Sequence, residues 1–405
     1  MQSEPALGNL PLTDFDHQPR TRLVFGNDSV ERTGELCREY GATKVLVVTD
    51  PGLVKAGHAE HVIVSLNKAG IPFELYDRVR ENPTTKDVDQ CLAVARTEKI
   101  DFIIGLGGGS SMDTAKGCNF ILTNGGVIKD YWGVAKAAKP MLPLIAIPTT
   151  AGTGSECQSF ALIAGEDTHL KMACGDPKAA AKVAILDPKL TVSLPAQVTA
   201  NTGIDAIAHA VETAVTKKRN PLSLMYSHEA FKLCVTSLPK VLSNPKDLEA
   251  RGRMLLGAAY AGLAIENSML GAAHSAANPL TAHYNTVHGT AVGMMLPLVV
   301  RFNSQDPVAL QGYAELASAP EIASVRGGLQ SALEALISRL DSLLNLAGMP
   351  RSLADLKVQP DMLKTLAREA SKQWTAGFNP RAIGEEDFVT LFERAFDRRS
   401  DGDMV

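Results

Sequence analysis

Short apolar runs and stretches with helical spacing alternate through the first half of the chain. The run at 44–50 is apolar at consecutive positions, which is typical of a parallel strand buried on both faces. Strands are also predicted near 23–25, 73–76, 102–105, 143–148 and 182–188, and helices at 30–40, 59–69 and 86–99. This alternation predicts a doubly wound α/β domain built on a parallel sheet.

Beyond about residue 200 the spacing of apolar positions becomes helical almost throughout. Alanine-rich segments predict helices at 205–216, 223–238, 248–266 and 329–346. A chain of 405 residues also exceeds the size at which one hydrophobic core usually keeps growing, so two domains are expected. The predicted organisation is a polar N-terminal arm at 1–21, an α/β domain at 22–200 and an all-α domain at 201–405.

Composition narrows the partners of this protein to small molecules. The formal net charge is −4, and no long run of like charges is present, which argues against nucleic acid and anionic membranes as partners. The N-terminus lacks the features of a signal peptide, and no apolar segment has the length of a membrane span. The six cysteines form no C-x-x-C pair and are expected to be reduced thiols. A soluble, cytoplasmic protein is predicted.

Histidines are concentrated in one short stretch of the second half. Residues 274–289 contain three of the nine histidines, His274, His283 and His288. Upstream, helical spacing would put Asp205 and His209 one turn apart on a single face. Imidazole and carboxylate are common ligands of zinc and ferrous iron. One carboxylate and up to three imidazoles could therefore bind one divalent metal ion.

A glycine cluster after one predicted strand has the geometry of a phosphate site. Gly107, Gly108, Gly109 and Ser110 follow the strand at 102–105 and precede a helix start, where free N–H groups and the positive helix end favour a pyrophosphate. The spacing is not G-x-G-x-x-G, and a glycine turn that serves packing alone is the alternative. A second loop at 149–155 follows another strand, so both should meet one ligand at the carboxyl edge of a Rossmann-like sheet.

Asp50 ends the strand of the run at 44–50 and is a candidate for the adenosine ribose. Its carboxylate could accept hydrogen bonds from the ribose hydroxyls and repel a 2′-phosphate, which favours NAD over NADP. The alternative is that Asp50 caps a turn or helix beside Pro51 and Gly52.

Several separated motifs occur in a fixed order between about Arg22 and Phe396. They are Gly107–Ser110 with Asp113 and Lys116, Pro148–Thr150 through Glu156, Asp205 with His209, His274 with His288, and Asn379–Pro380–Arg381. In this combination the chain resembles the iron-containing, group III, alcohol dehydrogenases. The resemblance implies an N-terminal dinucleotide-binding domain, a helical C-terminal domain, a dehydroquinate synthase-like fold and a catalytic divalent metal between the domains. A homodimer is a further expectation from the family.

The resemblance also implies roles for individual residues. The implied metal ligands are Asp205, His209, His274 and His288, for Fe²⁺ or alternatively Zn²⁺. The implied NAD contacts are Asp50, Gly108, Gly109, Ser110, Asp113, Thr149, Thr150, Thr153 and Lys171, the last expected on a loop.

One position departs from the family pattern. Relatives commonly carry a second histidine four residues after the first, beside the nicotinamide, whereas this chain has Asn278. Asparagine can hydrogen-bond but cannot titrate, so both the proton-relay role and the nicotinamide-positioning role of that histidine are in question. His283 could replace the relay, could support a ligand, or could be a surface residue.

The resulting prediction is a metal-dependent alcohol dehydrogenase or aldehyde reductase. It would transfer hydride between NAD(H) and a small primary alcohol or aldehyde, while the metal polarises the substrate oxygen. Alternatives within the same fold are a hydroxyacid–oxoacid transhydrogenase, a polyol dehydrogenase and a lyase acting on a phosphorylated substrate. A non-catalytic NAD-binding module is a further alternative, against which stands the presence of all four implied metal ligands.

Overall fold

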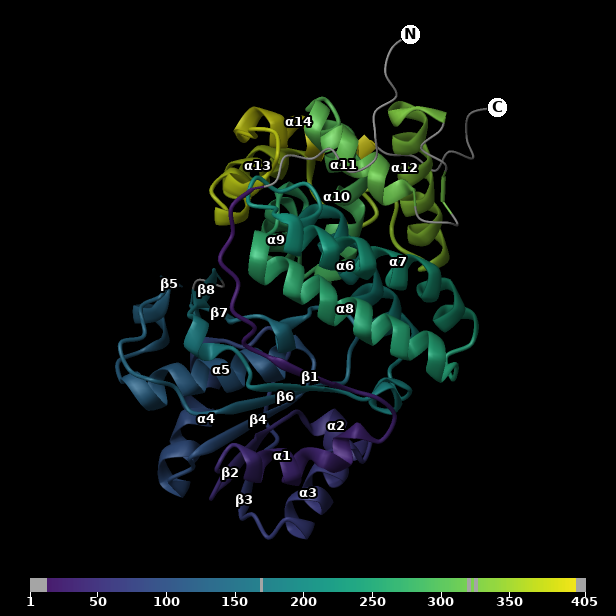
Figure 1. Ribbon diagram of the computed structural model, residues 1–405. Coiled ribbons are helices and arrows are strands. Elements are labelled where there is room, and N and C mark those ends of the chain that lie inside the picture. The colour runs from purple at the N-terminus through teal and green to yellow at the C-terminus, as the bar shows by residue number, and fades with distance from the viewer. Residues whose placement is uncertain (1–12, 168–169, 319–321, 324–326, 398–405) are drawn as a thin grey trace. The chain divides into compact units, whose positions relative to one another are not determined.

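The computed structural model describes residues 13–167, 170–318, 322–323 and 327–397 (Figure 1). Its contacts define two compact units, of which one comprises residues 18–195 and 244–262 and the other the remaining residues. Helix α8 (Leu248–Ser268) contributes its first part to the former and its last part to the latter. Residues 13–21 of the predicted arm form neither helix nor strand, and residues 1–12 lie outside the described residues. The domain boundaries given above stay a prediction.

The α/β unit is built on a six-stranded, wholly parallel sheet. In spatial order its strands are β1 (Arg22–Phe25), β9 (Val183–Leu186), β6 (Leu144–Pro148), β4 (Phe102–Gly107), β2 (Val45–Val48) and β3 (Phe73–Tyr76). The predicted doubly wound fold class is confirmed.

Helices cover both faces of this sheet, as Figure 1 shows. They are α1 (Thr33–Glu39) and α3 (His58–Lys68) on one face, and α4 (Thr85–Glu98) and α5 (Gly109–Asn124) on the other. In β2, Val45 and Val47 pack towards α1 and α3, whereas Leu46 and Val48 pack towards α4 and α5. Since both faces of the strand are buried, its sequence is apolar at every position rather than at alternate ones.

The order of the strands reverses at β2. From β2 the chain passes outward to β3 and then returns to β4 on the opposite side of β2. The segment after β2 enters α2 (Pro51–Lys55) and α3, while the segment after β4 enters α5 on the other face. Adjacent loops that leave a parallel sheet in opposite directions form the crevice in which such folds bind ligands.

A second, three-stranded sheet in the same unit was not predicted. Its spatial order is β5 (Gly133–Val134), β8 (Lys171–Gly175) and β7 (Phe160–Ala164), with β7 antiparallel and β5 parallel to β8. Lys171, expected on a loop, is the first residue of β8. These strands contain two to five residues, several of them alanine or glycine, so their local signal is weak and their pairing depends on distant partners. Short 3-10 helices in this unit are η1 (Ser29–Arg32), η2 (Ile128–Tyr131), η3 (Ser155–Cys157), η4 (Pro177–Ala179) and η5 (Pro188–Thr191).

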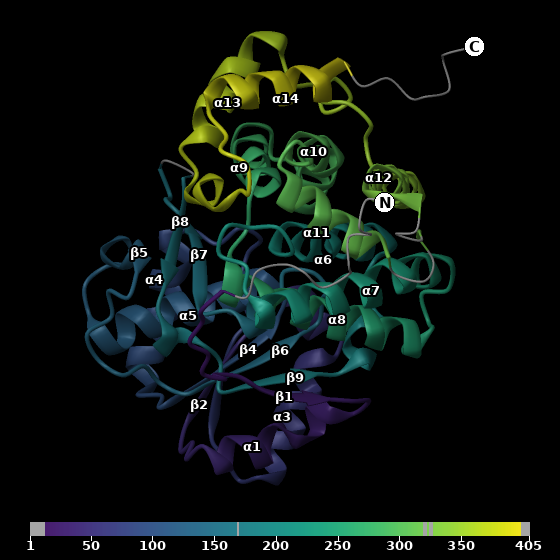
Figure 2. The same ribbon diagram turned by 45° about the horizontal axis from the view of Figure 1, so that its top comes forward.

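The other unit is mostly helical, as predicted, and the structure assigns no strand to its described residues. Its α-helices, besides the end of α8, are α6 (Ala196–Thr213), α7 (Pro221–Ser243), α9 (Ala272–Tyr284), α10 (His288–Asn303), α11 (Pro307–Ala317), α12 (Leu329–Leu346), α13 (Leu363–Ser371) and α14 (Glu385–Asp397). It also contains the 3-10 helices η7 (Pro360–Met362) and η8 (Trp374–Phe378). Helix α10 packs against α6, α9 and α14 (Figure 2). Nearly every side chain of α6 after Val198 is buried, so most polar residues on this helix are largely shielded from bulk water.

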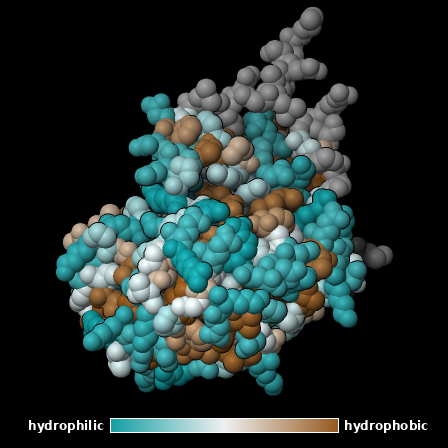
Figure 3. Space-filling model, turned by 60° about the horizontal axis from the view of Figure 1, so that its bottom comes forward, coloured by the Kyte–Doolittle hydropathy of each residue, from teal (hydrophilic) through white to brown (hydrophobic). Residues whose placement is uncertain are grey.

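Hydrophilic residues cover much of the face shown in Figure 3, with hydrophobic ones in small groups between them. Scattered apolar side chains of this kind are usual on protein surfaces. In the described part of the chain, no helix combines the length and the apolar character needed to cross a bilayer.

Candidate active site

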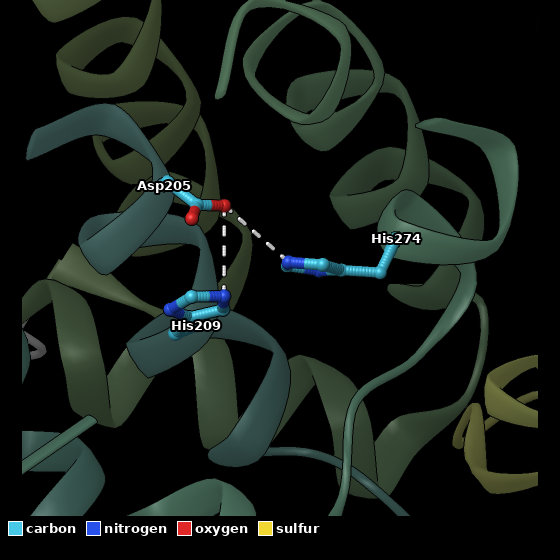
Figure 4. A group of neighbouring side chains, drawn as sticks. All are labelled: Asp205, His209 and His274. Atoms are coloured by element: carbon cyan, nitrogen blue, oxygen red, sulfur yellow. Dashed lines mark ion pairs between the residues drawn. The ribbon is translucent and has the colours of Figure 1, made fainter. Parts of the chain in front are cut away.

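Three buried side chains of the helical unit converge on one point. Asp205 and His209 lie one turn apart on α6, and His274 lies in the first turn of α9. Nε2 of His209 and Nε2 of His274 are each 3.5 Å from Oδ1 of Asp205 (Figure 4). One ligand atom from each of the three residues lies within 4.8 Å of those of the other two. The i, i+4 spacing read from the sequence thus places two of the three groups.

The chemistry of this cluster fits a divalent metal ion. Oδ1 of Asp205 and Nε2 of His274 are buried and have no hydrogen-bond partner among the described residues, a costly arrangement for polar atoms unless a ligand satisfies them. Ligand bonds of 2.0–2.2 Å in a tetrahedral site separate neighbouring ligand atoms by about 3.3–3.6 Å. The distances of 3.5 Å from Oδ1 of Asp205 to Nε2 of His209 and of His274 fall in this range. Burial alone would raise the pKa of Asp205, but the neighbouring imidazoles, His209 foremost, lower it well below its ordinary value.

His288 adjoins this cluster from the first turn of α10. Its Nε2 lies 4.0 Å from Oδ1 of Asp205, and its ring centroid is 5.3 Å from that of His274. The His288 side chain is 29% exposed, against 5–6% for the side chains of Asp205, His209 and His274. The centre is therefore most open beside His288, whose role as the fourth ligand stays a prediction.

Glu212 was not identified from the sequence, although it belongs to this centre. Its Oε2 accepts a hydrogen bond from Nδ1 of His274 at 2.6 Å. Burial opposes protonation of His274, yet the charge of Glu212, the interaction with Asp205 and the hydrogen bond to Glu212 raise its pKa to about 9. Glu212 follows Asp205 by seven residues and His209 by three on one helix, and this spacing could have indicated it.

Two residues weighed for proton transfer have partners outside the cluster. Asn278, one turn after His274 on α9, donates from Nδ2 to Oε1 of Gln373 at 3.0 Å. His283 is exposed near the end of α9, and its Nε2 lies 2.8 Å from Oε2 of Glu369. The group of ligand atoms around Asp205 does not include His283. Its position corresponds to the surface residue considered in the sequence analysis.

The glycine cluster of the α/β unit opens α5 without a side-chain cap. Gly108 is the N-cap residue of this 16-residue helix, so the first N–H groups are left for a ligand. Gly107 has a φ of 143°, and a Cβ there would lie 2.4 Å from Oγ of Ser111. Ser110 lies in the first turn of α5, and its Oγ accepts from the backbone N–H of Asn82 at 3.3 Å. Only glycine at position 107 permits this turn at the end of β4.

The second predicted loop lies directly beside the glycine cluster. A Cβ on Gly108 would be 3.4 Å from the Thr150 side chain, and one on Gly109 would be 3.0 Å from the Thr153 side chain. Thr149 directly follows β6, and its backbone N–H donates to the Gly107 carbonyl at 3.0 Å. The segments after β4 and β6 thus form one continuous polar edge.

The buried side chain of Lys116 binds the backbone at the end of the second loop. The ammonium group of Lys116 on α5 donates to Oγ and the carbonyl of Ser155 and to the carbonyls of Gln158 and Phe160, at 2.6–3.1 Å. Asp113, predicted to contact NAD, accepts from Oγ of Ser155 at 3.2 Å. Burial raises the pKa of Asp113 to about 6 against the opposing charges of Lys116 and Lys171. Asp113 is therefore part of the network that shapes the loop, and its contact with NAD stays a prediction.

Asp50 caps a helix, which is the alternative to ribose binding given in the sequence analysis. Its Oδ1 accepts from the backbone N–H of Leu53 at 3.1 Å, which caps α2. It lies at the end of β2, beside the strand that carries Gly107, and therefore at the reversal of the sheet. A carboxylate accepts several hydrogen bonds, so the cap leaves capacity for a ribose.

Comparison with known proteins identifies the family. The model of the iron-containing alcohol dehydrogenases matches residues 19–188, and the model of the C-terminal region of the Fe-containing alcohol dehydrogenase family matches residues 199–396. This chain therefore belongs to the iron-containing alcohol dehydrogenase family.

Individual relatives span nearly the whole chain. Alcohol dehydrogenase 4 of Schizosaccharomyces pombe is 36% identical over 92% of this chain and 87% of its own length. The NAD-dependent methanol dehydrogenase of Bacillus methanolicus is 34% identical over 95% of this chain and its full length. A crystal structure of 1,3-propanediol oxidoreductase superimposes with a TM-score of 0.91, at 33% identity, over 95% of this chain and 100% of that one.

Proposed function

We propose that this protein is an NAD-dependent alcohol dehydrogenase and aldehyde reductase that acts on small primary alcohols and aldehydes with a bound divalent metal. Alcohol and aldehyde oxidoreduction follows from its family and relatives. The observation that carries the metal-dependent mechanism is the buried convergence of Asp205, His209 and His274. The methanol dehydrogenase and the propanediol oxidoreductase among its relatives are named for small primary alcohols, which supports the substrate class.

Asp205, His209, His274 and His288 would hold the metal. When bound there, a divalent ion supplies a Lewis acid that stabilises negative charge on the substrate oxygen. The family name favours Fe²⁺. Zn²⁺ is the alternative, because imidazole and carboxylate bind both and affinity alone does not select iron.

The carboxyl edge of the parallel sheet would hold the dinucleotide. The N–H groups at the start of α5, with Gly108, Gly109 and Ser110, would bind the pyrophosphate. The adjoining hydroxyls of Thr149, Thr150 and Thr153 and the charge of Lys171 would complete the contacts. NAD supplies the hydride acceptor, and NADH the donor.

Burial around the metal centre and the amide of Asn278 limit which groups can transfer a proton. Burial of Asp205, His209 and His274 excludes water on their side, while the more exposed His288 leaves an approach for substrate. The amide of Asn278 binds Gln373 and neither gains nor loses a proton near neutral pH. We infer that Asn278 does not act as an acid or base in the reaction.

Metal removal tests this function directly. Anaerobically purified protein is expected to contain about one Fe²⁺ or Zn²⁺ per chain and to oxidise NADH with small aldehydes. Chelation should remove the metal and the turnover together, and adding back either ion should restore both, because the substrate oxygen loses its electrostatic partner. Metal analysis and NADH absorbance are the measurements.

Three other results would contradict the proposal. Full turnover after complete removal of the metal would contradict the metal-dependent mechanism. Cofactor binding without turnover across a broad panel of alcohols and aldehydes would favour a non-catalytic module. A nicotinamide that stays bound, with a requirement for a second carbonyl substrate, would favour a transhydrogenase. Light scattering on the same preparation checks the expected homodimer.

Replacing Asp50 by serine tests the choice of cofactor. Serine keeps a side-chain cap for α2 but removes the carboxylate that would repel a 2′-phosphate. The wild type is expected to prefer NADH, and the preference in kcat/KM for NADH over NADPH should fall roughly tenfold in the variant, equivalent to about 1.4 kcal/mol.

Asp306→Ser is the matched control, because Asp306 also precedes a proline and caps a helix, α11, in the helical unit. It should leave the cofactor preference unchanged. A wild-type enzyme that prefers NADPH, or an Asp50→Ser variant with unaltered preference, would exclude the ribose role of Asp50.

A further inference from the structure

The start of α9 is capped by side chains from two distant segments. Its N-cap residue, Gly271, has no side chain to accept from the first N–H groups of the helix. Glu212 accepts from the backbone N–H of Gly271 at 3.2 Å and of Ala273 at 2.7 Å. Oδ1 of Asn379 accepts from the backbone N–H of Ala272 at 3.2 Å. Three consecutive backbone donors are thus satisfied by two buried polar side chains.

Gly271 makes room for both of these caps. A Cβ at this position would lie 3.1 Å from Oδ1 of Asn379 and 3.2 Å from Oε1 of Glu212. Glu212 is 4% exposed and Asn379 is 1% exposed, so neither cap exchanges readily with water. The missing side chain at Gly271 therefore leaves the space that the accepting atoms of Glu212 and Asn379 occupy.

Glu212 also joins the helix start to the candidate metal centre. The same Oε2 that accepts from Gly271 accepts from Nδ1 of His274 at 2.6 Å. When Nδ1 carries the donated hydrogen, Nε2 is the ring atom left to bind a metal, and this atom lies 3.5 Å from Oδ1 of Asp205. One carboxylate thus fixes the backbone and the ring of His274.

Asn379 connects the helix start to α10, which carries His288 at its first residue. Nδ2 of Asn379 donates to Oδ1 of Asn303, the last residue of α10, at 2.7 Å and to the Arg381 carbonyl at 2.8 Å. The guanidinium of Arg381 lies 3.8 Å from the ring centroid of Phe302 and donates to its carbonyl. The Asn379–Pro380–Arg381 motif thereby ties together the two helices that carry His274 and His288.

We propose that Glu212 and Asn379 are positioning residues of the metal centre, which together hold the first turn of α9 so that Nε2 of His274 faces Asp205 before any metal binds. This proposal rests on the proposed metal site. It assigns a role to the Asn379–Pro380–Arg381 motif, which the reaction itself does not use. Glu212 acts through His274, and Asn379 through the backbone of α9.

Titration of the metal-free full-length protein with Co²⁺ tests the proposal. Glu212→Gln has the same shape, but it turns one oxygen acceptor into an amide donor that faces other donors. Loss of a group that orients a metal-binding histidine typically costs 10- to 100-fold in metal affinity. The Co²⁺ dissociation constant should rise by about that factor in Glu212→Gln and by a smaller factor in Asn379→Ala. The visible Co²⁺ absorption should change in Glu212→Gln, because the ring of His274 is no longer fixed.

Ser275→Ala is the matched control. Ser275 is buried in the same turn of α9, and its hydroxyl bonds to the Gly271 carbonyl and to Oγ1 of Thr375 rather than to Glu212. It should lower the thermal midpoint of the metal-free protein about as much as Glu212→Gln while leaving the Co²⁺ dissociation constant and spectrum unchanged. If Glu212 had a purely structural role, Glu212→Gln would lower the thermal midpoint without changing the Co²⁺ dissociation constant or spectrum.

The outcomes separate this inference from the function on which it rests. Failure of the wild type to bind Co²⁺ would overturn the metal site itself. Wild-type binding with an unchanged dissociation constant in a folded Glu212→Gln variant would overturn the positioning role, as would an equal loss in Ser275→Ala. If Glu212→Gln does not fold, Asn379→Ala decides by the same criteria.

Discussion

Replacing Asp205 by alanine is expected to abolish metal retention and turnover together. Asp205 supplies the carboxylate of the buried cluster, and its Oδ1 lies 3.5–4.0 Å from Nε2 of each of the three histidines. Without it, the ion would lose its anionic ligand, and the neutral imidazoles would bind more weakly. Loss of Lewis-acid stabilisation of several kcal/mol corresponds to a fall in kcat/KM on the order of a thousandfold.

Metal content and aldehyde reduction should be measured on the same preparation of Asp205→Ala. Asp355→Ala is the control, since Asp355 accepts backbone hydrogen bonds in the same unit but belongs to no cluster of possible metal ligands among the described residues. It should retain both properties. Asp205→Ala protein that turns over normally without metal would disprove the proposed mechanism, and full metal retention would show that Asp205 is not a ligand.

Replacing Lys116 by methionine is expected to destabilise the α/β unit and to weaken cofactor binding. Lys116 is fully buried, and its ammonium satisfies three backbone carbonyls and the Ser155 hydroxyl. Methionine fits the space but leaves these acceptors, and the nearby Asp113, without their cation. Breaking one side of a buried charged interaction typically costs roughly 3–5 kcal/mol, or on the order of 10 °C in the unfolding midpoint.

The effect on the cofactor follows from the loop that Lys116 holds. Gln158 donates from Nε2 to the Thr153 carbonyl at 2.7 Å, so displacement of the Gln158 backbone also moves Thr153 beside Gly109. The NADH dissociation constant, measured by fluorescence, should rise on the order of tenfold, about 1.4 kcal/mol.

Lys189→Met makes the same substitution at an exposed lysine that is paired with Asp28. Exposed pairs contribute little to stability, so the unfolding midpoint and NADH binding of this control should match the wild type. A Lys116→Met variant with wild-type stability would mean that the buried acceptors find other partners and that Lys116 does not hold the loop.

The pattern of apolar residues within single segments was sufficient to predict the fold class. The continuous apolar run of β2 predicted a strand buried on both faces, and the structure places helices on both sides of it. The i, i+4 spacing of Asp205 and His209 was readable because a helix fixes which residues share a face. The glycine cluster indicated the turn at the end of β4 for the same local reason, since only glycine adopts its backbone conformation.

Only the tertiary structure determined which distant residues complete these local features. Glu212 and His274 lie 62 residues apart, and Lys116 and the Ser155 carbonyl 39 residues apart, and no local pattern records such pairs. The second sheet, with Lys171 in β8, also depends on pairing between segments whose own strand signal is weak. Local periodicity determines which face of an element is buried, whereas the partner of each buried polar group depends on how the whole chain packs.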